Sequence, residues 1–467
     1  MFQLMNNILL EFRNCFKRTN TWRWFVIIVI GFMIRSDNRG VTSVITALKL
    51  KPRLYHNMLH FFRSNAYETG AISEKWTKLA MRHGNVERVV NRVVLLGDHS
   101  KVSKEGLRMP GVQAMYQDSQ NSGKSSYIEG HNFGQVSAVI TDGHISRSLP
   151  LMTELQASPK TESGEGGGGS LVMQMLELTH RAAEAIGEPV YVALDAYFSS
   201  GVAWSAADRT VADGGVKLVE IVTRAQSNTV AYREPDPAGA KKRGRPKKYG
   251  DKITLRDLFS ESSRFTESTM QLYGKPSKVR YLCLDLIWRP VKRLVRFVLT
   301  VTDSGSCVLM SSDLSLDPES IVSIYAMRFK IETSFDEQKN DMGGFAYHFW
   351  TTALAKRKKW QKAMPPIGVD GQKKIEKTMQ ATQTFVCLNT IAAGLLAIIA
   401  FSHNREIWAS YPGWVRTLRS HIPTIATTKC SLSHVFNDLL SNFTSLPSFN
   451  FIVPLLRTKV YWFDDAA

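Results

Sequence analysis

The chain has few cysteines and no cysteine motif. Its five cysteines are an odd number, and none belongs to a CxxC pair or to a Cys/His ligand spacing. This absence argues against a zinc site and favours a reducing cytoplasm. The cysteines are Cys15, Cys283, Cys307, Cys387 and Cys430.

Long uncharged runs are also scarce. The apolar stretch Trp24–Ile34 spans about half of the ~20 residues that a membrane helix needs, and a basic residue follows it instead of a small-residue cleavage site. We therefore expect neither an anchor nor a signal peptide there. Phe385–Ser402 carries no charge and approaches the length of a membrane span, but Asn389, Thr390 and Gly394 interrupt it. We expect a helix buried in the protein, with a membrane span as the alternative.

Acidic residues are fewer than basic ones. The chain has 59 Lys+Arg against 41 Asp+Glu, a formal net charge of +18 and a pI near 9.6. A polyanionic partner is the simplest explanation, and a basic soluble protein without such a partner is the alternative. Hydrophobic residues make up 44% of the chain, which is ordinary globular usage, so most of it should fold. At 467 residues it exceeds the size of one hydrophobic core, and two or more units are expected.

The patterning changes several times along the chain. Residues 1–90 lack strand alternation and predict short basic helices, such as Val41–Leu50 and Leu54–Arg63, that dock on DNA or cap the main domain. From residue 91, buried strands alternate with helices, which predicts an α/β core with a mixed sheet flanked by helices. The predicted units are a helical DNA-binding region at 1–90, a first core part at 91–215, a β-rich insertion at 216–311, and a second core part with C-terminal helices at 312–467.

Individual elements follow from short patterns. Strands are predicted at Arg92–Asp98, Gln135–Thr141, Ile145–Leu151, Pro189–Phe198, Tyr281–Trp288 and Arg296–Asp303. A Lys/Gly-rich loop is predicted directly after Asp98. Helices are predicted at Leu171–Ile186, after the glycine-rich run Gly164–Ser170, and at Asp317–Lys339, where Pro318 suits the first turn.

Three carboxylates stand out by position. Asp98 and Asp195 lie near the carboxyl ends of two predicted buried strands, and Glu332 lies on the helix that follows the β insertion. Mg²⁺ prefers oxygen ligands and takes only a few carboxylates, so such a triad can hold two ions. Two ions would activate an attacking water or 3′-hydroxyl and stabilise the leaving oxygen of an in-line phosphoryl transfer. The alternative is three solvated or capping carboxylates.

The helix that carries Glu332 presents further polar groups. Arg328, Glu332 and Lys339 follow Tyr325 by 3, 7 and 14 residues, which places all four within about 60° on one face of a continuous helix. The two cations would hold phosphates on either side of a scissile bond while Glu332 reaches the metal. The alternative is an ordinary amphipathic helix whose charged residues are exposed to solvent and have no catalytic role.

These motifs point to a family. The spacing Y-x2-R-x3-E-x6-K resembles the YREK signature of the DDE transposases of bacterial insertion sequences. LDAYFSSG around Asp195 is similar to that family's second-aspartate strand, and GDHSKVSKEGLRMPGVQ to its first-aspartate segment, although His99 stands where the larger branch often has an acid or Thr. RGRPKKYG, RFKIETSF and YHFW, Tyr347–Trp350, also fit, and the resemblance covers most of residues 90–355.

The resemblance implies an RNase H-like core, interrupted by the β insertion, that cuts transposon ends as a homodimer with Mg²⁺, for which Mn²⁺ can substitute. By the same analogy Asp98, Asp195 and Glu332 bind the metals, while Tyr325, Arg328 and Lys339 contact DNA. Its partners would be terminal inverted repeats and target DNA, in the cytoplasm of a bacterial cell. A related two-metal nuclease and a catalytically silent DNA-binding regulator are the alternatives.

Two more features suit DNA. The basic run of Arg243, Arg245, Lys247 and Lys248 matches an extended segment in a minor groove, or else a solvated basic turn. Trp204 and Trp288 are candidates for stacking on a flipped base. The alternative is the commoner role of tryptophan as a core or interface residue.

Overall fold

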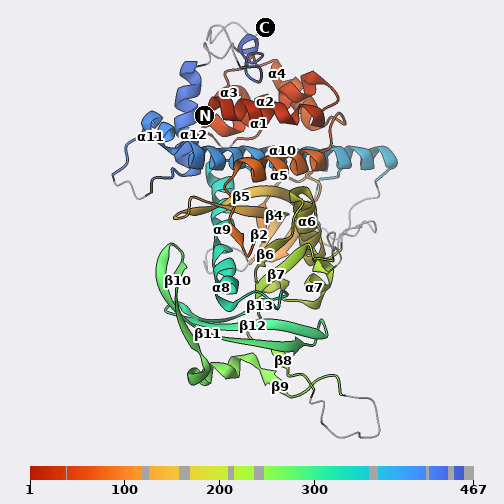
Figure 1. Cartoon of the computed structure of the whole chain (residues 1–467). Helices are drawn as coiled ribbons and strands as arrows, with labels where there is room; N and C mark the ends of the chain where they lie inside the picture. The colour runs from red at the N-terminus through yellow and green to blue at the C-terminus, as the bar shows by residue number, and fades with distance from the viewer. Residues whose placement is uncertain are drawn as a thin grey trace.

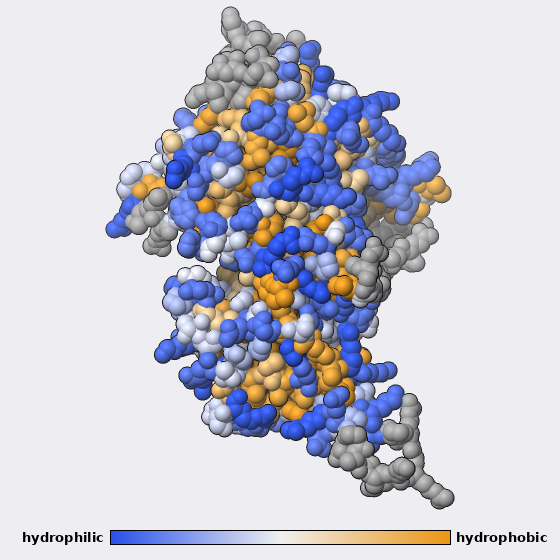
Figure 2. Space-filling view, in the orientation of Figure 1, coloured by the Kyte–Doolittle hydropathy of each residue, from blue (hydrophilic) through white to orange (hydrophobic). Residues whose placement is uncertain are grey.

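The computed structural model describes residues 1–37, 39–116, 126–156, 169–208, 215–235, 247–356, 367–416, 420–439 and 446–456. Its shape is elongated: a layer of helices from the N-terminal and C-terminal parts of the described chain lies at one end, the core sheet lies in the middle, and the insertion lies at the other end (Figure 1). Hydrophilic side chains are spread over much of the visible face, and a hydrophobic area lies over the lower part, where the insertion strands are (Figure 2).

The core sheet has the strand order of an RNase H-like fold. Three antiparallel strands are followed by two parallel ones, in the order β5-β4-β2-β6-β7, with helices α6 and α7 joining the later strands. All five residues of β6 are buried, as expected for a parallel strand that is covered on both faces. The elements are β2 (Arg92–Ser103), β4 (Tyr127–Thr141), β5 (Ser146–Gln156), α6 (Leu171–Ile186), β6 (Val190–Leu194), α7 (Gly201–Ala207) and β7 (Val219–Arg224).

Local chemistry sets the ends of these elements. The Ser170 hydroxyl accepts a hydrogen bond from the Met173 amide at the start of α6, and Gly187, with φ +83°, ends the helix in the left-handed conformation. The predicted helix Leu171–Ile186 is therefore confirmed at both ends. Residues 164–168 of the glycine-rich run before it lie outside the described residues.

Two predictions about the core are wrong in extent. β2 does not end at Asp98 but continues to Ser103, because its second half pairs with β4 from Asp98↔Gln135 to Ser103↔Gly130. This polar stretch, HSKVS at 99–103, has the composition of a loop, yet hydrogen bonds to the partner strand satisfy its backbone. In addition β7, which falls within the span assigned to the insertion, pairs in parallel with β6 and is the fifth core strand.

The insertion extends the same sheet. β13 pairs antiparallel with β7, so the β-rich unit continues the core in one 13-stranded sheet. The predicted strands Tyr281–Trp288 and Arg296–Asp303 correspond to β11 and β12. The insertion strands are β8 (Val230–Tyr232), β9 (Lys252–Thr254), β10 (Thr266–Leu272), β11 (Lys275–Trp288), β12 (Arg293–Thr302) and β13 (Gly305–Ser311); β1 (Arg88–Val89) and β3 (Gln113–Tyr116) pair at the other side, with β2 and β4.

Helices from both ends of the chain cover β5. The long helix α10 contacts α2, α5 and β5, and it runs across the molecule with α1–α4 on one side and α5 and the sheet on the other (Figure 1). In the part of the chain that the structure describes, α10 is the one helix long and apolar enough to cross a membrane, and 94% of its apolar window is buried inside the protein. The predicted buried helix is thus confirmed. The helices are α1 (Phe2–Glu11), α2 (Thr19–Ile34), α3 (Thr42–Ala47), α4 (Leu54–Phe62), α5 (Thr69–His83), α10 (Val369–Ser402), α11 (Asn404–Ser410) and α12 (Ile425–Leu439).

Candidate active site

Asp98 and Asp195 lie side by side where the parallel strands separate. The last parallel pair of β2 and β6 is Leu96↔Ala193, and two further residues along each strand bring the chain to Asp98 and Asp195. The Asp195 carboxylate accepts a hydrogen bond from the Tyr197 amide at 3.0 Å, which fixes it at the start of a short 3₁₀ turn. The sheet therefore presents two carboxylates at one edge.

A helix brings Glu332 to the same place. The Asp317 carboxylate caps α8 (Pro318–Met327), and α9 (Phe329–Asp336) follows after a tightened turn at Arg328. Arg328 Nη1 donates to Asp98 Oδ2 at 3.1 Å, and its Nη2 donates to Glu332 Oε1 at 2.7 Å. One guanidinium thus joins the strand carboxylate to the helix carboxylate, as the fork geometry of arginine allows.

The charges at this edge are unbalanced. Three carboxylates face one guanidinium, a net charge of −2 among the four side chains. Burial, reinforced by the Asp195 carboxylate, raises the pKa of Asp98 to about 6 in spite of Arg328. Burial likewise raises the pKa of Asp195, with a contribution from Glu332. The site therefore holds excess negative charge that protein groups leave uncompensated.

The three carboxylates are suitable ligands for divalent cations, but Arg328 occupies two of them. Hard cations prefer carboxylate oxygens, and the three carboxylates supply them from two strands and a helix. Within the described ranges, however, no three His, Cys, Asp or Glu side chains converge closely enough to hold a metal ion. Arg328 instead bridges Asp98 and Glu332, so a cation and Arg328 would compete for the same oxygens.

Lys339 and Tyr325 flank the carboxylates, though not on one regular helix. A π-helix (Glu337–Asp341) follows α9, so the prediction of a continuous α-helix to Lys339 is wrong. The wider turn accompanies the burial of Gln338 in polar contacts described below. Lys339 Nζ still reaches the sheet and donates to the carbonyl of Lys101, three residues beyond Asp98, at 3.3 Å. Tyr325 is half-buried, and burial raises its pKa.

A buried polar network fixes the helix on the sheet. Gln135, directly opposite Asp98 on β4, donates to the Ser334 hydroxyl at 3.1 Å and accepts from Gln338 Nε2 at 2.6 Å. Thr153 on β5 donates to the same Gln135 oxygen at 3.1 Å. These side chains are at most 3% exposed, so each hydrogen bond is made away from water and constrains geometry strongly. The network sets the position of Glu332 relative to Asp98.

Two buried cations hold the far end of the same helix. Arg35, at the end of α2, is fully buried and donates to the carbonyls of Met342 and Gly343. Lys429 on α12 donates to the carbonyl of Asp341. Cations stabilise the free carbonyls at a helix C-terminus. Residues from the N-terminal and C-terminal helices therefore position the helix that bears Glu332. The sequence analysis did not predict a role for Arg35, Lys429 or Gln135.

His99 occupies the position where the sequence departs from the resembling family. Its ring packs on Phe198 with centroids 5.4 Å apart, and Nε2 contacts Gln156 Oε1 at 2.5 Å. Burial lowers its pKa to about 4, so this histidine is neutral at physiological pH. It adds no charge beside Asp98.

The remaining predicted contacts lie elsewhere. Lys247 and Lys248 are exposed just before β9, which is the seventh strand from β2 along the sheet, at the far side of the insertion. Arg243 and Arg245 lie outside the described residues. Trp204 and Trp288 are 0% and 5% exposed and pack edge to face against each other, so the idea that they stack on a base is wrong.

One comparison with known proteins identifies the family. A model of the DDE superfamily endonucleases matches residues 11–272. No curated protein matches the chain. Among solved structures, piggyBac transposase in its synaptic complex with hairpin DNA is 13% identical with a TM-score of 0.35, over 96% of this chain and 78% of that one. The NurA nuclease from Sulfolobus solfataricus is 12% identical with a TM-score of 0.19, over 60% of this chain and 86% of that one. Because the family model spans more than half of the 467 residues, the protein belongs to the DDE superfamily endonucleases.

Proposed function

We propose that this chain is a DNA transposase of the YREK group of bacterial insertion sequences, which cleaves transposon ends and joins them to target DNA. The observation that carries the proposal is the shared guanidinium: Arg328 contacts both Asp98 and Glu332, beside Asp195, at an edge with net charge −2. Excess negative charge of this kind suits divalent cations. Asp98, Asp195 and Glu332 would hold Mg²⁺, with Mn²⁺ as a substitute.

Each side chain then has a task. Divalent ions held there would polarise the scissile phosphate and lower the pKa of an attacking water. Arg328 would then be free to leave Asp98 and Glu332, and its guanidinium would bind a DNA phosphate next to the cleavage point. Lys339, held against β2, and Tyr325 would contact the backbone on either side. The internal ion pairs of Arg328 would thus be replaced by an ion pair with the substrate.

The rest of the molecule supplies the means of holding DNA. The net charge of +18 favours binding to phosphates along an extended surface. The helical region at 1–90 would bind terminal inverted repeats, and the basic run that ends at Lys248 would contact DNA at the insertion, away from the cleavage point. Synapsis of two transposon ends calls for a homodimer acting on DNA in the bacterial cytoplasm.

The test is Mg²⁺-dependent cleavage of a labelled duplex that carries the terminal inverted repeats flanking the gene. We expect the wild-type chain to cleave it and Glu332→Gln to cleave at least about a thousandfold more slowly, because loss of a metal ligand removes several kcal/mol of transition-state stabilisation. DNA binding should persist in the variant, since Glu332 is 46% exposed and its removal leaves the fold intact.

Three outcomes would change the proposal. Equal cleavage by wild-type and Glu332→Gln protein would exclude the carboxylate triad. Cleavage without joining to a target duplex would indicate a two-metal nuclease. Binding without cleavage by either protein would indicate a silent DNA-binding regulator.

A further inference from the structure

Strand β10 lies at an edge of the insertion, and its outer side has no partner strand in the part of the chain that the structure describes. β10 pairs with β11 alone. β11 in turn pairs with β12 only from Arg280 onward, so the hairpin of β10 and β11 projects beyond β12 and curves away from the rest of the insertion (Figure 1). A row of backbone N–H and C=O groups is therefore open to a further strand.

The turn of this hairpin determines which backbone groups of β10 face outward. Tyr273 and Gly274 have φ of +53° and +77°, which is typical of a two-residue hairpin loop, and the pair Leu272↔Lys275 closes it. The closing pair of such a loop exchanges hydrogen bonds, and every second pair along the hairpin does the same. The residues between them direct their backbone groups away from β11. These residues are Glu267, Thr269 and Gln271.

The edge of β10 lacks the features that usually prevent strand pairing. Natural edge strands are protected by lysine, proline, a bulge or a covering segment. β10 contains neither lysine nor proline, its pairing with β11 runs without a register shift, and the side chains of Glu267, Thr269 and Gln271 are exposed. Glu267 is the one charged residue of the strand. A negative edge disfavours DNA phosphates as its partner, and open backbone groups favour a protein strand.

A second copy of β10 is complementary to the first. When two copies run antiparallel about a two-fold axis at Thr269, each Glu267 lies opposite Gln271 of the partner subunit, and the two threonines face each other. Residues whose backbone groups point outward then meet one another, which is the arrangement that an antiparallel ladder requires. No like charges are opposed, and a threonine pair across strands is favourable.

The apolar face of the hairpin also continues across this axis. Met270 and Leu272 are 8% and 5% exposed, on the face of β10 opposite to Thr269, and β10 contacts α8. In the paired arrangement Met270 lies opposite Ser268 of the partner subunit and diagonal to the partner's Met270. The apolar layer of one insertion would therefore run into that of the other.

We propose that β10 pairs with β10 of a second copy of this chain, antiparallel about Thr269, and joins the two insertions in one continuous sheet. The inference rests on the proposed function, because synapsis of two transposon ends is what calls for a homodimer. The pairing of one short strand buries less area than a standard interface, so the dimer should dissociate on dilution.

The experiment measures self-association of the full chain by sedimentation velocity, without DNA and in EDTA, over about a hundredfold range of concentration. The wild-type chain should shift from a 52.5 kDa monomer to a dimer. Thr269→Glu places two carboxylates opposite each other at the axis, whereas within each hairpin the new carboxylate lies beside Lys278, so the fold should be retained. We expect this variant to weaken the dimer at least about tenfold.

Two further proteins make the result specific to the axis. Thr269→Lys should also weaken the dimer, and an equimolar mixture of the two Thr269 variants should recover it, because opposite charges then face each other. Gln271→Lys is the matched control. It adds a charge to the same exposed face, but opposite Glu267 of the partner subunit, so the dimer should persist.

Other results would overturn the inference. A wild-type chain that stays monomeric, or a dimer that Thr269→Glu leaves intact, would each exclude pairing through β10. Losses that the mixture does not recover would exclude contact at the axis, and an equal loss in Gln271→Lys would exclude the register about Thr269. A dimer with the expected charge dependence, in a chain that fails to cleave transposon ends, would support the contact while contradicting the transposase proposal.

Discussion

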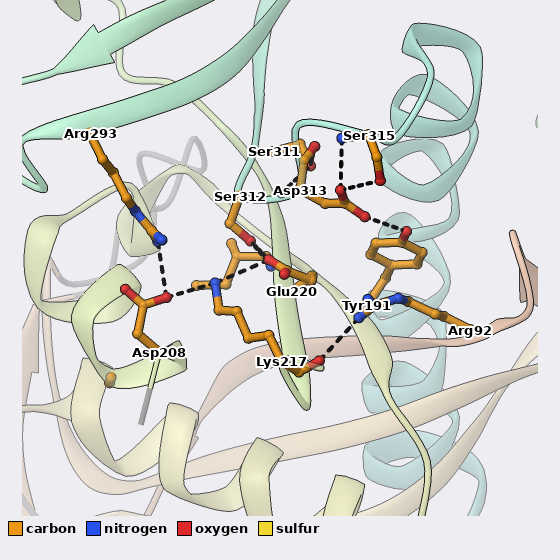
Figure 3. Close-up of polar contacts among 12 residues, drawn as sticks. Arg92, Tyr191, Asp208, Lys217, Glu220, Arg293, Ser311, Ser312, Asp313 and Ser315 are labelled. Carbon is orange, nitrogen blue, oxygen red and sulfur yellow. Dashed lines mark hydrogen bonds and ion pairs between the residues drawn. The ribbon is translucent and has the colours of Figure 1, made fainter. Parts of the chain in front are cut away.

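The amino and carboxyl ends of the parallel strands β6 and β7 differ in how fully their carboxylates are paired with cations. At their amino ends Lys217 lies 2.7 Å from Asp208 and 3.1 Å from Glu220, and Arg293 of β12 lies 3.0 Å from Asp208 (Figure 3). Ser312 donates a further hydrogen bond to Glu220. These contacts tie β13 and β12 of the insertion to the core.

A second group at the amino ends is equally well matched. The Tyr191 hydroxyl donates to Asp313 at 2.8 Å, and the Ser315 amide and hydroxyl donate to the other oxygen of that carboxylate (Figure 3). Arg92 lies over the Tyr191 ring. Burial acts to raise the pKa of Asp313, but these hydrogen bonds outweigh it and lower the pKa on balance.

At the carboxyl ends of β6 and β7, negative side chains outnumber positive ones. Arg92, Lys217 and Arg293 match Asp208, Glu220 and Asp313 at the amino ends, whereas a single guanidinium faces three carboxylates at the other. The pKa of Asp313 is lowered, while the pKa of Asp98 is raised to about 6. Matched charge at one end stabilises the fold, and unmatched charge at the other end costs stability. A cost that the fold tolerates is expected at a functional site.

The largest expected effect comes from neutralising Asp98. Its folded pKa of about 6 exceeds the unfolded value of 3.8, so the native state binds more protons, and stability falls as the pH rises from about 4 to about 6. Asp98→Asn should therefore raise the free energy of unfolding at pH 7.5 in EDTA by up to ~3 kcal/mol, and by little at pH 4. Urea denaturation at both pH values measures this.

Asp313→Asn is the matched control, and its effect should have the opposite sign. Because the folded pKa of Asp313 is lowered, the ionised form stabilises the protein at neutral pH, and that stability is lost as the pH falls below the unfolded value. Mg²⁺ should stabilise the wild-type chain at pH 7.5 but not Asp98→Asn. A loss of stability in Asp98→Asn equal to that in Asp313→Asn would contradict the contrast between the two ends.

The sequence was sufficient for the elements that have a strong local pattern. Helix α6 is bounded by Ser170 and Gly187 and was predicted closely. The apolar run of β6 was recognised, but the strand was predicted too long: it ends at Leu194, and Ala196–Phe198 form a 3₁₀ turn instead of continuing it to Phe198. The extension of β2 was missed because tertiary pairing with β4, and not propensity, makes the stretch from His99 to Ser103 a strand. The assignment of β7 to the insertion failed for the same reason, since pairing partners are invisible in one sequence.

The sequence predicted which carboxylates would lie near one another, but not the contacts between them and Arg328. The spacing of Arg328 and Glu332 places them on one helical face, and the structure joins them through a hydrogen bond. Nothing in the sequence showed that Arg328 also reaches Asp98, or that Gln135 fixes the helix on the sheet. Such contacts join residues about 200 positions apart, and only the packed core defines them.

An intermediate effect is expected at Gln135. Gln135→Met removes the side-chain amide and leaves Ser334, Gln338 and Thr153 without a shared partner, which should lower the free energy of unfolding by ~1–3 kcal/mol. If the network positions Glu332, the Mg²⁺ concentration for half-maximal cleavage should also rise, by roughly ten- to a hundredfold. Metal titration of the cleavage rate measures this shift.

Thr390→Val provides the control for that measurement. The Thr390 hydroxyl donates to Thr153 at 3.0 Å, at the edge of the network and away from α9. We expect a loss of ~1 kcal/mol in stability and no change in the Mg²⁺ requirement. Equal Mg²⁺ shifts in the two variants would show that general loosening, and not the position of Glu332, sets metal affinity.

The smallest effect is expected at the matched end. Arg293 and Asp208 are 39% and 38% exposed, so their ion pair is screened by water and salt, and Arg293→Gln should lower the free energy of unfolding by no more than ~1 kcal/mol. The loss should shrink further in 1 M salt, where the screening length falls to about 3 Å. Lys217 remains to pair with Asp208, so the insertion stays attached to the core. The half-maximal Mg²⁺ concentration should not change, because no described polar contact links Arg293 to the carboxylates. If Arg293→Gln shifted it as much as Gln135→Met, the two ends of the sheet would be coupled, and charge balance would not separate structural from functional residues.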